Sequence, residues 1–191
     1  MYQLIIFCFL LSISANAQFN KEHNLNYEET ITVEGKTQAQ LKEKFHKWML
    51  SEFDKSNIKA SKNTDNEILL DIASQLDIKQ GNTSMPIAIY FGILSEFEDN
   101  QFKIQINHID VGPTKTPVKI DFPDFKSFKK EMQETVNHLS GDAKAKNQAI
   151  LDDEKKIKQI YNRGLNNHNN MLTAVKKYIT ELVKKMKNYI K

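Results

Sequence analysis

The residues that could do acid–base or metal chemistry are scattered along this 191-residue chain. The sequence has no GxSxG, P-loop, GxGxxG or HExxH pattern, each of which places a nucleophile, a phosphate cradle or metal ligands at fixed spacing. The histidines show no metal-ligand spacing; they are His23, His46, His108, His138 and His168. The sequence therefore predicts no catalytic set, no metal site and no cofactor.

Several of these side chains have a structural interpretation. His108 shares the two-residue phase of Phe102, Ile104 and Ile106, so we expect a residue at the end of a strand rather than a ligand. His46 lies beside an apolar helical stripe and should be half-exposed. Trp48, the one tryptophan, should be in the core.

Acidic residues cluster once. Asp152, Asp153 and Glu154 could hold a hard cation. Lys155 and Lys156 follow directly, so pairing within a helix is the expected role. Asp110 and Asp121 flank a proline-containing segment, and no base accompanies them in the sequence.

A regular apolar seam surrounded by lysines lies near the C-terminus. The seam repeats every three or four positions: Leu172, Val175, Ile179, Leu182, Met186 and Tyr189. The lysines around it are Lys176, Lys177, Lys184, Lys185, Lys187 and Lys191.

Three interpretations of this seam are open. It could pack on the protein's own sheet or helices, or join two copies as in a coiled coil. The lysines could also contact an anionic envelope surface, either lipid or another polyanion. Aromatic residues are few among the lysines, so no nucleic acid is expected as a partner.

Charge is divided unevenly along the chain. Residues 19–154 carry a net charge of −6 and residues 155–191 carry +9, which accounts for the overall +3. The basic C-terminal part again points to an anionic partner.

The N-terminus resembles a secretory signal peptide. An apolar run from Leu4 to Ile13 is too short to cross a bilayer, which needs about 20 residues. Ala15 and Ala17 provide the small residues of a cleavage site, which predicts Gln18 as the new N-terminus. Cys8 would be removed with the signal, so the mature chain would contain no cysteine and no disulfide.

The remaining pattern is strand, helix, then antiparallel strands. Residues 27–33 alternate as a strand, and Thr37 with Gln40 forms a capping box for a helix ending near Phe53. Extended segments are expected at 58–61, at 67–79 with a bulge near Ser74, at 87–98 and at 102–111. A loop at 80–84 and a hairpin turn at Asp99-Asn100 connect them.

Helices follow a proline-containing segment at 112–124. Asp124 should cap the first helix, a second should run from Asp142 to about Arg163, and a third from Met171 to Ile190. Gly164 and the asparagine-rich residues after it have poor helix propensity, which predicts a break there.

These elements resemble an exported bacterial family with a domain of unknown function (DUF4468-like) described as having a TBP-like fold. The resemblance covers residues 27–111. It rests on Thr32-Val33-Glu34-Gly35-Lys36-Thr37, on Leu41 and Trp48, and on the strands Ile87–Phe97 and Phe102–Ile106. It implies a fold and export but no activity, and a TBP-like fold does not imply DNA binding.

The sequence as a whole predicts an α+β protein: an antiparallel sheet with one helix packed on it, followed by a helical C-terminal extension. The expected parts are a signal peptide at 1–17, a TBP-like domain at 18–111, a linker at 112–124 and the extension at 125–191. We expect an exported, non-enzymatic protein, periplasmic or secreted, that binds a partner or the envelope. Two alternatives are open: a hydrolase using carboxylates in a cleft, and a membrane-surface binder acting through the basic C-terminal helix.

Overall fold

The computed structural model describes residues 18–20, 24–80 and 83–191. The predicted signal peptide, with Ala15 and Ala17, lies outside the described residues. Gln18 is the first residue of strand β1.

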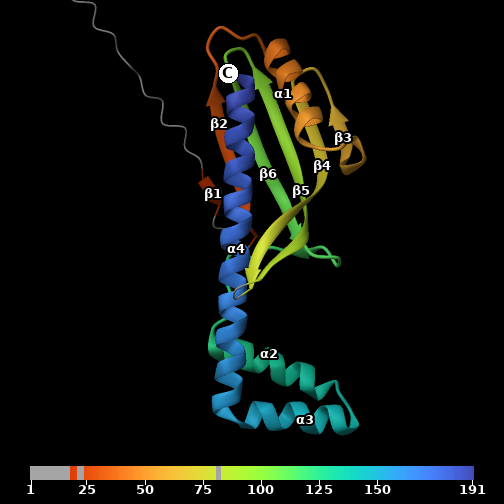
Figure 1. Ribbon diagram of the computed structural model, residues 1–191, viewed down its shortest axis with the longest axis vertical. Coiled ribbons are helices and arrows are strands. Elements are labelled where there is room, and N and C mark those ends of the chain that lie inside the picture. Colours follow the sequence, from red (N-terminus) through yellow and green to blue (C-terminus); the bar gives the residue numbers. More distant parts are fainter. Residues whose placement is uncertain (1–17, 21–23, 81–82) are drawn as a thin grey trace, which may run out of the picture.

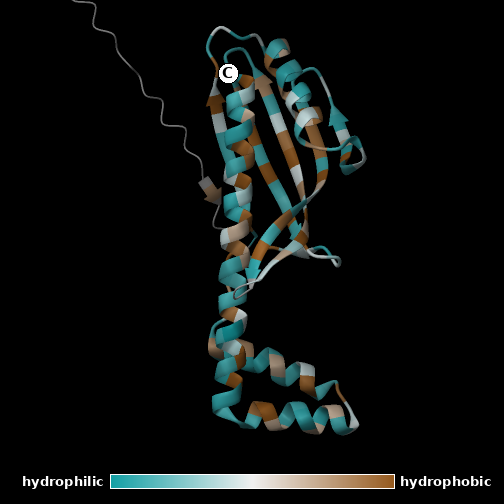
Figure 2. Ribbon diagram, viewed as in Figure 1, coloured by the Kyte–Doolittle hydropathy of each residue, from teal (hydrophilic) through white to brown (hydrophobic). Residues whose placement is uncertain are grey.

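One antiparallel sheet forms the body of the molecule (Figure 1). Its strands are β1 (Gln18–Asn20), β2 (Asn26–Thr32), β3 (Ile58–Asn63), β4 (Glu67–Gln80), β5 (Thr83–Glu98), β6 (Gln101–Val111) and β7 (Thr116–Pro117). The order across the sheet is β1-β2-β6-β5-β4-β3, and β7 pairs with the end of β6. Apolar and polar residues alternate along the strands (Figure 2), so one face is built to be covered and the other to meet solvent.

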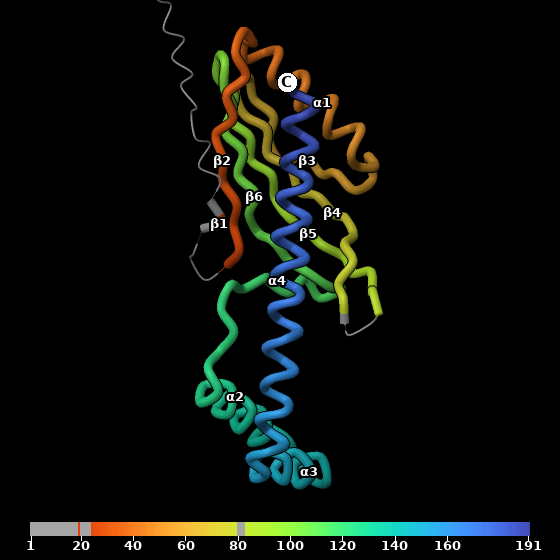
Figure 3. The backbone as a smooth tube through the Cα atoms, turned by 60° about the vertical axis from the view of Figure 1, so that its left-hand side comes forward, coloured from red at the N-terminus to blue at the C-terminus, as the bar shows by residue number. Residues whose placement is uncertain are grey.

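Two helices cover the apolar face. Helix α1 (Gln38–Glu52) starts at the predicted capping box, where Thr37 and Gln40 bond each other's backbone N–H groups. Helix α4 (Glu154–Ile190) runs along the sheet with its C-terminal half and extends beyond it with its N-terminal half (Figure 3). Trp48 is buried in this core, as predicted.

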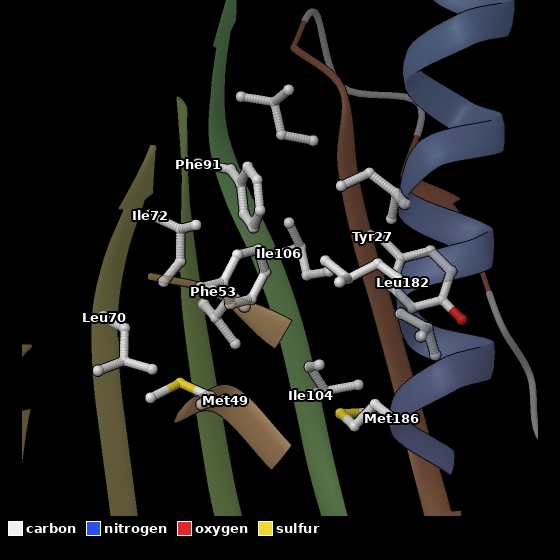
Figure 4. Packing of buried hydrophobic residues seen from close by; sticks show 14 of the residues in the cluster. Tyr27, Met49, Phe53, Leu70, Ile72, Phe91, Ile104, Ile106, Leu182 and Met186 are labelled. Atoms are coloured by element: carbon white, nitrogen blue, oxygen red, sulfur yellow. The ribbon is translucent and has the colours of Figure 1, made fainter. Parts of the chain in front are cut away.

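The two helices and the sheet share one continuous core. Figure 4 shows Met49 of α1, Ile104 of β6 and Met186 of α4 approaching each other from the three elements. The seam predicted near the C-terminus is therefore filled by the protein's own sheet and α1. Four of its predicted members are buried, Val175, Ile179, Leu182 and Met186, and Leu172 is partly buried. Tyr189 was wrongly placed in the seam, because it is 46% exposed and the buried positions of the last turns also include Val183 and Ile190.

A small helical lobe lies at the other end of α4 (Figure 1). It consists of α2 (Phe125–Asn137), α3 (Gly141–Asp152) and the first turns of α4. Its core holds three buried residues, Val136, Leu151 and Ile157. Asp124 caps α2 as predicted, because its carboxylate accepts a hydrogen bond from the Ser127 backbone N–H at 2.7 Å.

The predicted helix break at Gly164 is wrong, because α4 is continuous from Glu154 to Ile190. A Cβ at position 164 would come within 3.0 Å of the Phe122 ring, so the glycine permits close packing rather than a turn. The chain breaks instead at Asp153, whose carboxylate caps α4 by accepting from the Lys156 N–H. Lys156 and Lys158 also pair with Asp153 and Glu154, as expected of the acidic cluster.

The bulge expected near Ser74 is also misplaced. Strands β4 and β5 pair without a register shift, and the irregularities lie in β3 and where β5 meets β6. The loop expected at 80–84 is shorter than predicted, because β4 reaches Gln80 and β5 starts at Thr83.

Residues 112–124, predicted to be a linker, connect the sheet to the helices along the chain, but they do not separate two independent cores. Strand β7 and the buried Val118 attach this segment to the sheet. The Val118 carbonyl accepts a hydrogen bond from the Leu25 N–H, and the Val118 N–H donates one to the Ile109 carbonyl. The C-terminal half of the predicted extension then completes the core of the sheet domain.

Candidate functional site

The lysines of α4 are largely engaged by the protein itself. Lys185 pairs with Glu52 of α1, and Lys177 pairs with Glu181 one turn on. Lys176 lies over the Phe19 ring with its Nζ 5.7 Å from the ring centre. Because the apolar side of this segment is in the core, α4 has no free apolar face here to insert into a lipid surface.

Lys187 has the most buried partner. It binds Glu29 of β2, whose side chain is 1% exposed and also accepts a 2.6 Å hydrogen bond from the Tyr27 hydroxyl. Burial, and then the neighbouring Glu29 carboxylate, raise the pKa of the Tyr27 phenol above its ordinary value. This polar group joins α4 to β2, and its Glu29 carboxylate is already bonded to two side chains of the protein, so we assign it to structure.

Among the described residues, no helix packs on the opposite face of the sheet (Figure 3). A hollow of about 360 Å³ lies on this face, across β3, β4, β5 and β6. We call it the open-face depression. Its charged, aromatic and imidazole side chains come from Lys59, Asp71, Tyr90, His108, Asp110 and Lys115. The volume is at the low end of the range of small-molecule sites.

A β-bulge shapes the depression. Tyr90 pairs with Asp110 and Gly92 pairs with Asn107, so His108 and Ile109 together oppose Phe91. His108 takes a φ of +49°, in the left-handed region that a histidine adopts at a cost of about 1 kcal/mol or more. The bulge puts Ile109 into the core and leaves His108 exposed at the depression. The in-phase position predicted for His108 is therefore wrong.

Gly92 forms part of the lining. A Cβ there would come within 2.6 Å of the Asn107 Oδ1, so the glycine leaves room for the asparagine side chain against the strand. That Oδ1 is buried and has no hydrogen-bond partner among the described residues. Buried acceptors are normally paired, so an unpaired one is a notable feature of this site.

Lys115 lies above Tyr90. Its Nζ is 4.6 Å from the ring centre, at a distance that suits a cation–π contact. Gly112 and Lys115 both have positive φ, at 77° and 50°, so the turn between β6 and β7 is tightly bent to place this lysine. The depression thus has an aromatic ring, two carboxylates, two ammonium groups and one imidazole.

The model described as a domain of unknown function (DUF4468) with TBP-like fold matches residues 27–111. The similarity to the DUF4468 family is thus confined to residues 27–111. This range contains most of the sheet and α1, together with five of the six named side chains of the depression. The part of α4 that completes the core lies outside the matched range.

Two solved structures are similar to this chain. One is a DUF4468 family protein from Bacteroides ovatus, with 12% identity, a TM-score of 0.43, and coverage of 80% of this chain and 84% of that one. The other is a TBP-like protein from Parabacteroides distasonis, with 15% identity, a TM-score of 0.45, and coverage of 88% and 96%. No curated protein sequence matches the chain.

The other predicted residues lie apart from the open-face depression. His46 is exposed beside a groove on the far side of α1, and His168 contacts the Ile120 carbonyl at 3.1 Å. Asp121 is exposed beyond β7, away from Asp110. Within residues 18–20, 24–80 and 83–191, no group of three or more His, Cys, Asp or Glu side chains is placed to hold a metal ion. No helix among them is long and apolar enough to cross a membrane.

Sequence reasoning named His108 and Asp110 but missed their neighbours. An isolated glycine inside a strand is a recognised sign of a bulge or a close approach, and Gly92 interrupts β5 in this way. That signal would have moved the expected bulge from Ser74 to its actual place. Tyr90 and Lys115 carry no comparable sequence signal, because their contact depends on the turn after β6.

Proposed function

We propose that this protein is an exported, non-enzymatic binding protein, and that its open-face depression binds a neutral, hydroxyl-rich ligand such as an oligosaccharide. The strained His108 at the edge of the depression is the observation that carries the proposal. Strain of this kind is retained where a side chain must be held in a particular direction, and such positions cluster at binding sites.

The ligand class follows from the balance of charges. Asp71 and Asp110 offset Lys59 and Lys115, so the depression does not favour an ion of either sign. Carboxylates only accept hydrogen bonds and ammonium groups only donate them, whereas a hydroxyl does both. A ligand with many hydroxyl groups can therefore donate to the carboxylates and accept from the ammonium groups of the depression. The Tyr90 ring offers an apolar surface beside them.

The sequence motifs favour binding over hydrolysis. The chain has no pattern that places a catalytic nucleophile or metal ligands at fixed spacing, such as GxSxG or HExxH. The two carboxylates of the depression, Asp71 and Asp110, come from different strands, β4 and β6, and each has a lysine of the same depression to offset its charge.

Export is supported by the N-terminal sequence. The apolar run from Leu4 to Ile13 and the small residues Ala15 and Ala17 match the pattern of a cleaved signal peptide. A surface that recognises hydroxyl-rich polymers suits a protein outside the cytoplasm, where such polymers are displayed.

Fluorescence anisotropy with labelled oligosaccharides tests the proposal. The probes are cello-, chito-, malto- and xylo-oligosaccharides, each titrated with the chain from Gln18 to Lys191. We expect saturable binding to at least one series, and a loss of about tenfold or more in Tyr90→Ala and in Asp110→Asn. Tyr189→Ala is the matched control, because Tyr189 is an exposed tyrosine on α4.

Two results would contradict the proposal. One is no binding to any of the four series at millimolar protein. The other is equal loss of binding in Tyr90→Ala and Tyr189→Ala, which would place the ligand elsewhere. Turnover of a bound sugar that stops in both Asp71→Asn and Asp110→Asn would instead establish the hydrolase alternative.

A further inference from the structure

A second hollow adjoins the open-face depression. It has a volume of about 430 Å³ and shares Asn57 and Ala73 with the depression, so the two spaces meet. Together they are more than twice as large as the depression alone and still within the range of small-molecule sites. We call the second space the edge hollow.

The end of β3 creates the edge hollow. The pairing of β3 with β4 stops at Ile72, next to the short 3₁₀ helix Lys55–Asn57. From Ala73 onward, the outer side of β4 therefore has no strand partner in the described part of the chain. Ser74 and Gln75 both line the hollow, although neighbouring side chains of a strand face opposite sides. The hollow thus wraps around this edge of the sheet.

Ala73 is the β4 residue between the two spaces. On the same face of β4 it lies between Asp71 of the depression and Gln75 of the edge hollow. Tyr90 and Ala88 follow the same order on β5, because they pair with Ala73 and Gln75. Since the side chain at position 73 is a single methyl group, one linear ligand can lie across both spaces.

The edge hollow offers hydrogen-bonding groups that suit the same kind of ligand. Asp54, Asn57 and Gln75 are exposed there, and no other side chain among the described residues is hydrogen-bonded to them. The Asp54 carboxylate does not cap the 3₁₀ helix that follows it. A carboxylate accepts hydrogen bonds, whereas an amide both donates and accepts them. These three side chains can therefore bind hydroxyl groups.

The other polar side chains of the edge hollow are held by α4. Glu52 pairs with Lys185, and the Ser74 hydroxyl accepts a 2.8 Å hydrogen bond from the Tyr178 hydroxyl. These contacts fix the wall of the hollow next to α4. Because Lys185 offsets the charge of Glu52, the hollow does not require a cationic ligand.

We infer that the edge hollow is a second subsite of the open-face depression, and that the ligand is a linear oligosaccharide of several units rather than a mono- or disaccharide. Successive units run from Tyr90, over Ala73, to Asp54 and Gln75. This inference rests on the proposed function, because it assigns the length and path of the ligand that the depression would bind.

The dependence of affinity on chain length tests the inference. Isothermal titration calorimetry compares the unlabelled disaccharide and hexasaccharide of the cello-, chito-, malto- and xylo- series. In the series that binds, we expect the hexasaccharide to bind about tenfold or more tightly than the disaccharide, because its additional units contact the edge hollow.

A double variant separates these contacts from the statistical advantage of a longer chain. Asp54→Ala with Gln75→Ala should weaken hexasaccharide binding by about tenfold and leave disaccharide binding unchanged, because both residues line the edge hollow alone. The matched control is Asp121→Ala with Gln159→Ala, which replaces exposed residues of the same types outside both spaces. The control should keep wild-type affinity for both sugars. Circular dichroism melts check that both double variants are folded.

Two results would overturn the inference and leave the proposed function in place. One is equal affinity for the disaccharide and the hexasaccharide. The other is a preference for the hexasaccharide that the variant at positions 54 and 75 retains in full. Absence of binding by every sugar of either length would instead contradict the proposed function, and this inference with it.

Discussion

The backbone conformation of His108 lowers the stability of the fold and directs the imidazole toward the open-face depression. Its φ of +49° is unfavourable for a side chain with a Cβ, and glycine has no such cost. We predict that His108→Gly raises the free energy of unfolding by about 1 kcal/mol, a rise in Tm of about 2–4 °C for a chain of this size.

The same substitution should weaken oligosaccharide binding, because the imidazole at the depression is lost. Thermal melts and anisotropy on the same samples measure both effects. His138→Gly is the control, since His138 is an exposed cap of α2 with a φ of −84° and its replacement should give no gain in Tm. A variant at 108 that is less stable than wild type would contradict the assignment of strain.

Glu29 and Lys187 form a buried contact between two elements. The Glu29 side chain is 1% exposed, whereas Lys187 is 28% exposed and still partly solvated. Removal of the cation alone leaves a carboxylate in the core, so Lys187→Met should lower the free energy of unfolding by about 2–3 kcal/mol. Urea denaturation measures this change, and Lys184→Met on the exposed side of α4 is the control.

The double variant Glu29→Leu with Lys187→Met provides the decisive comparison. It removes both charges, so most of the stability should return, although the Tyr27 hydroxyl loses its acceptor. If the double variant is no more stable than Lys187→Met alone, the loss comes from packing of the lysine chain and not from the unpaired carboxylate.

At the level of elements, local signals predicted the first half of the fold well. The capping box at Thr37, the alternation of β5 and β6 and the turn at Asp99-Asn100 all act within a few residues, so the sequence contains them. Each of these was confirmed. The predictions that failed depended on more distant contacts: the helix break at Gly164, the bulge near Ser74 and the phase of His108.

The features that the sequence did not predict depend on contacts between residues that are distant along the chain. From the sequence alone, Gly164 predicts a helix break. In the structure it packs against Phe122, which is 42 residues away along the chain. The bulge near His108 depends on the pairing of β5 with β6. The open-face depression brings together side chains from β3, β4, β5, β6 and the turn before β7, so no single window of sequence contains it.

The whole molecule combines an acidic sheet part with a basic C-terminal helix. The sequence alone did not decide whether the lysines of α4 contact an anionic surface. We propose such a contact for the lysines of α4 that face solvent. Because the apolar seam is buried, such contact would be electrostatic alone. Co-sedimentation with vesicles containing anionic lipid should therefore fall to background at high salt. Binding that resists salt would mean that α4 leaves the sheet.

Export makes a prediction about the mature N-terminus. Cleavage after Ala17 would begin the chain at Gln18, where β1 also begins. Intact-mass spectrometry of the protein from the producing cells' envelope or medium should find Gln18, or its pyroglutamate, as the first residue. Exported material that retains Met1 would refute the cleavage.

Chemical-shift mapping by NMR locates the ligand contacts on the sheet. Two-dimensional NMR of isotope-labelled protein, titrated with the oligosaccharide series that binds best, gives the amide signals that shift. If the open-face depression binds the sugar, we expect shifts at Asp71, Tyr90, Gly92, His108 and Lys115, with few on α1 and α4. Shifts confined to the helix-covered side of the sheet, or to the lobe of α2 and α3, would contradict it.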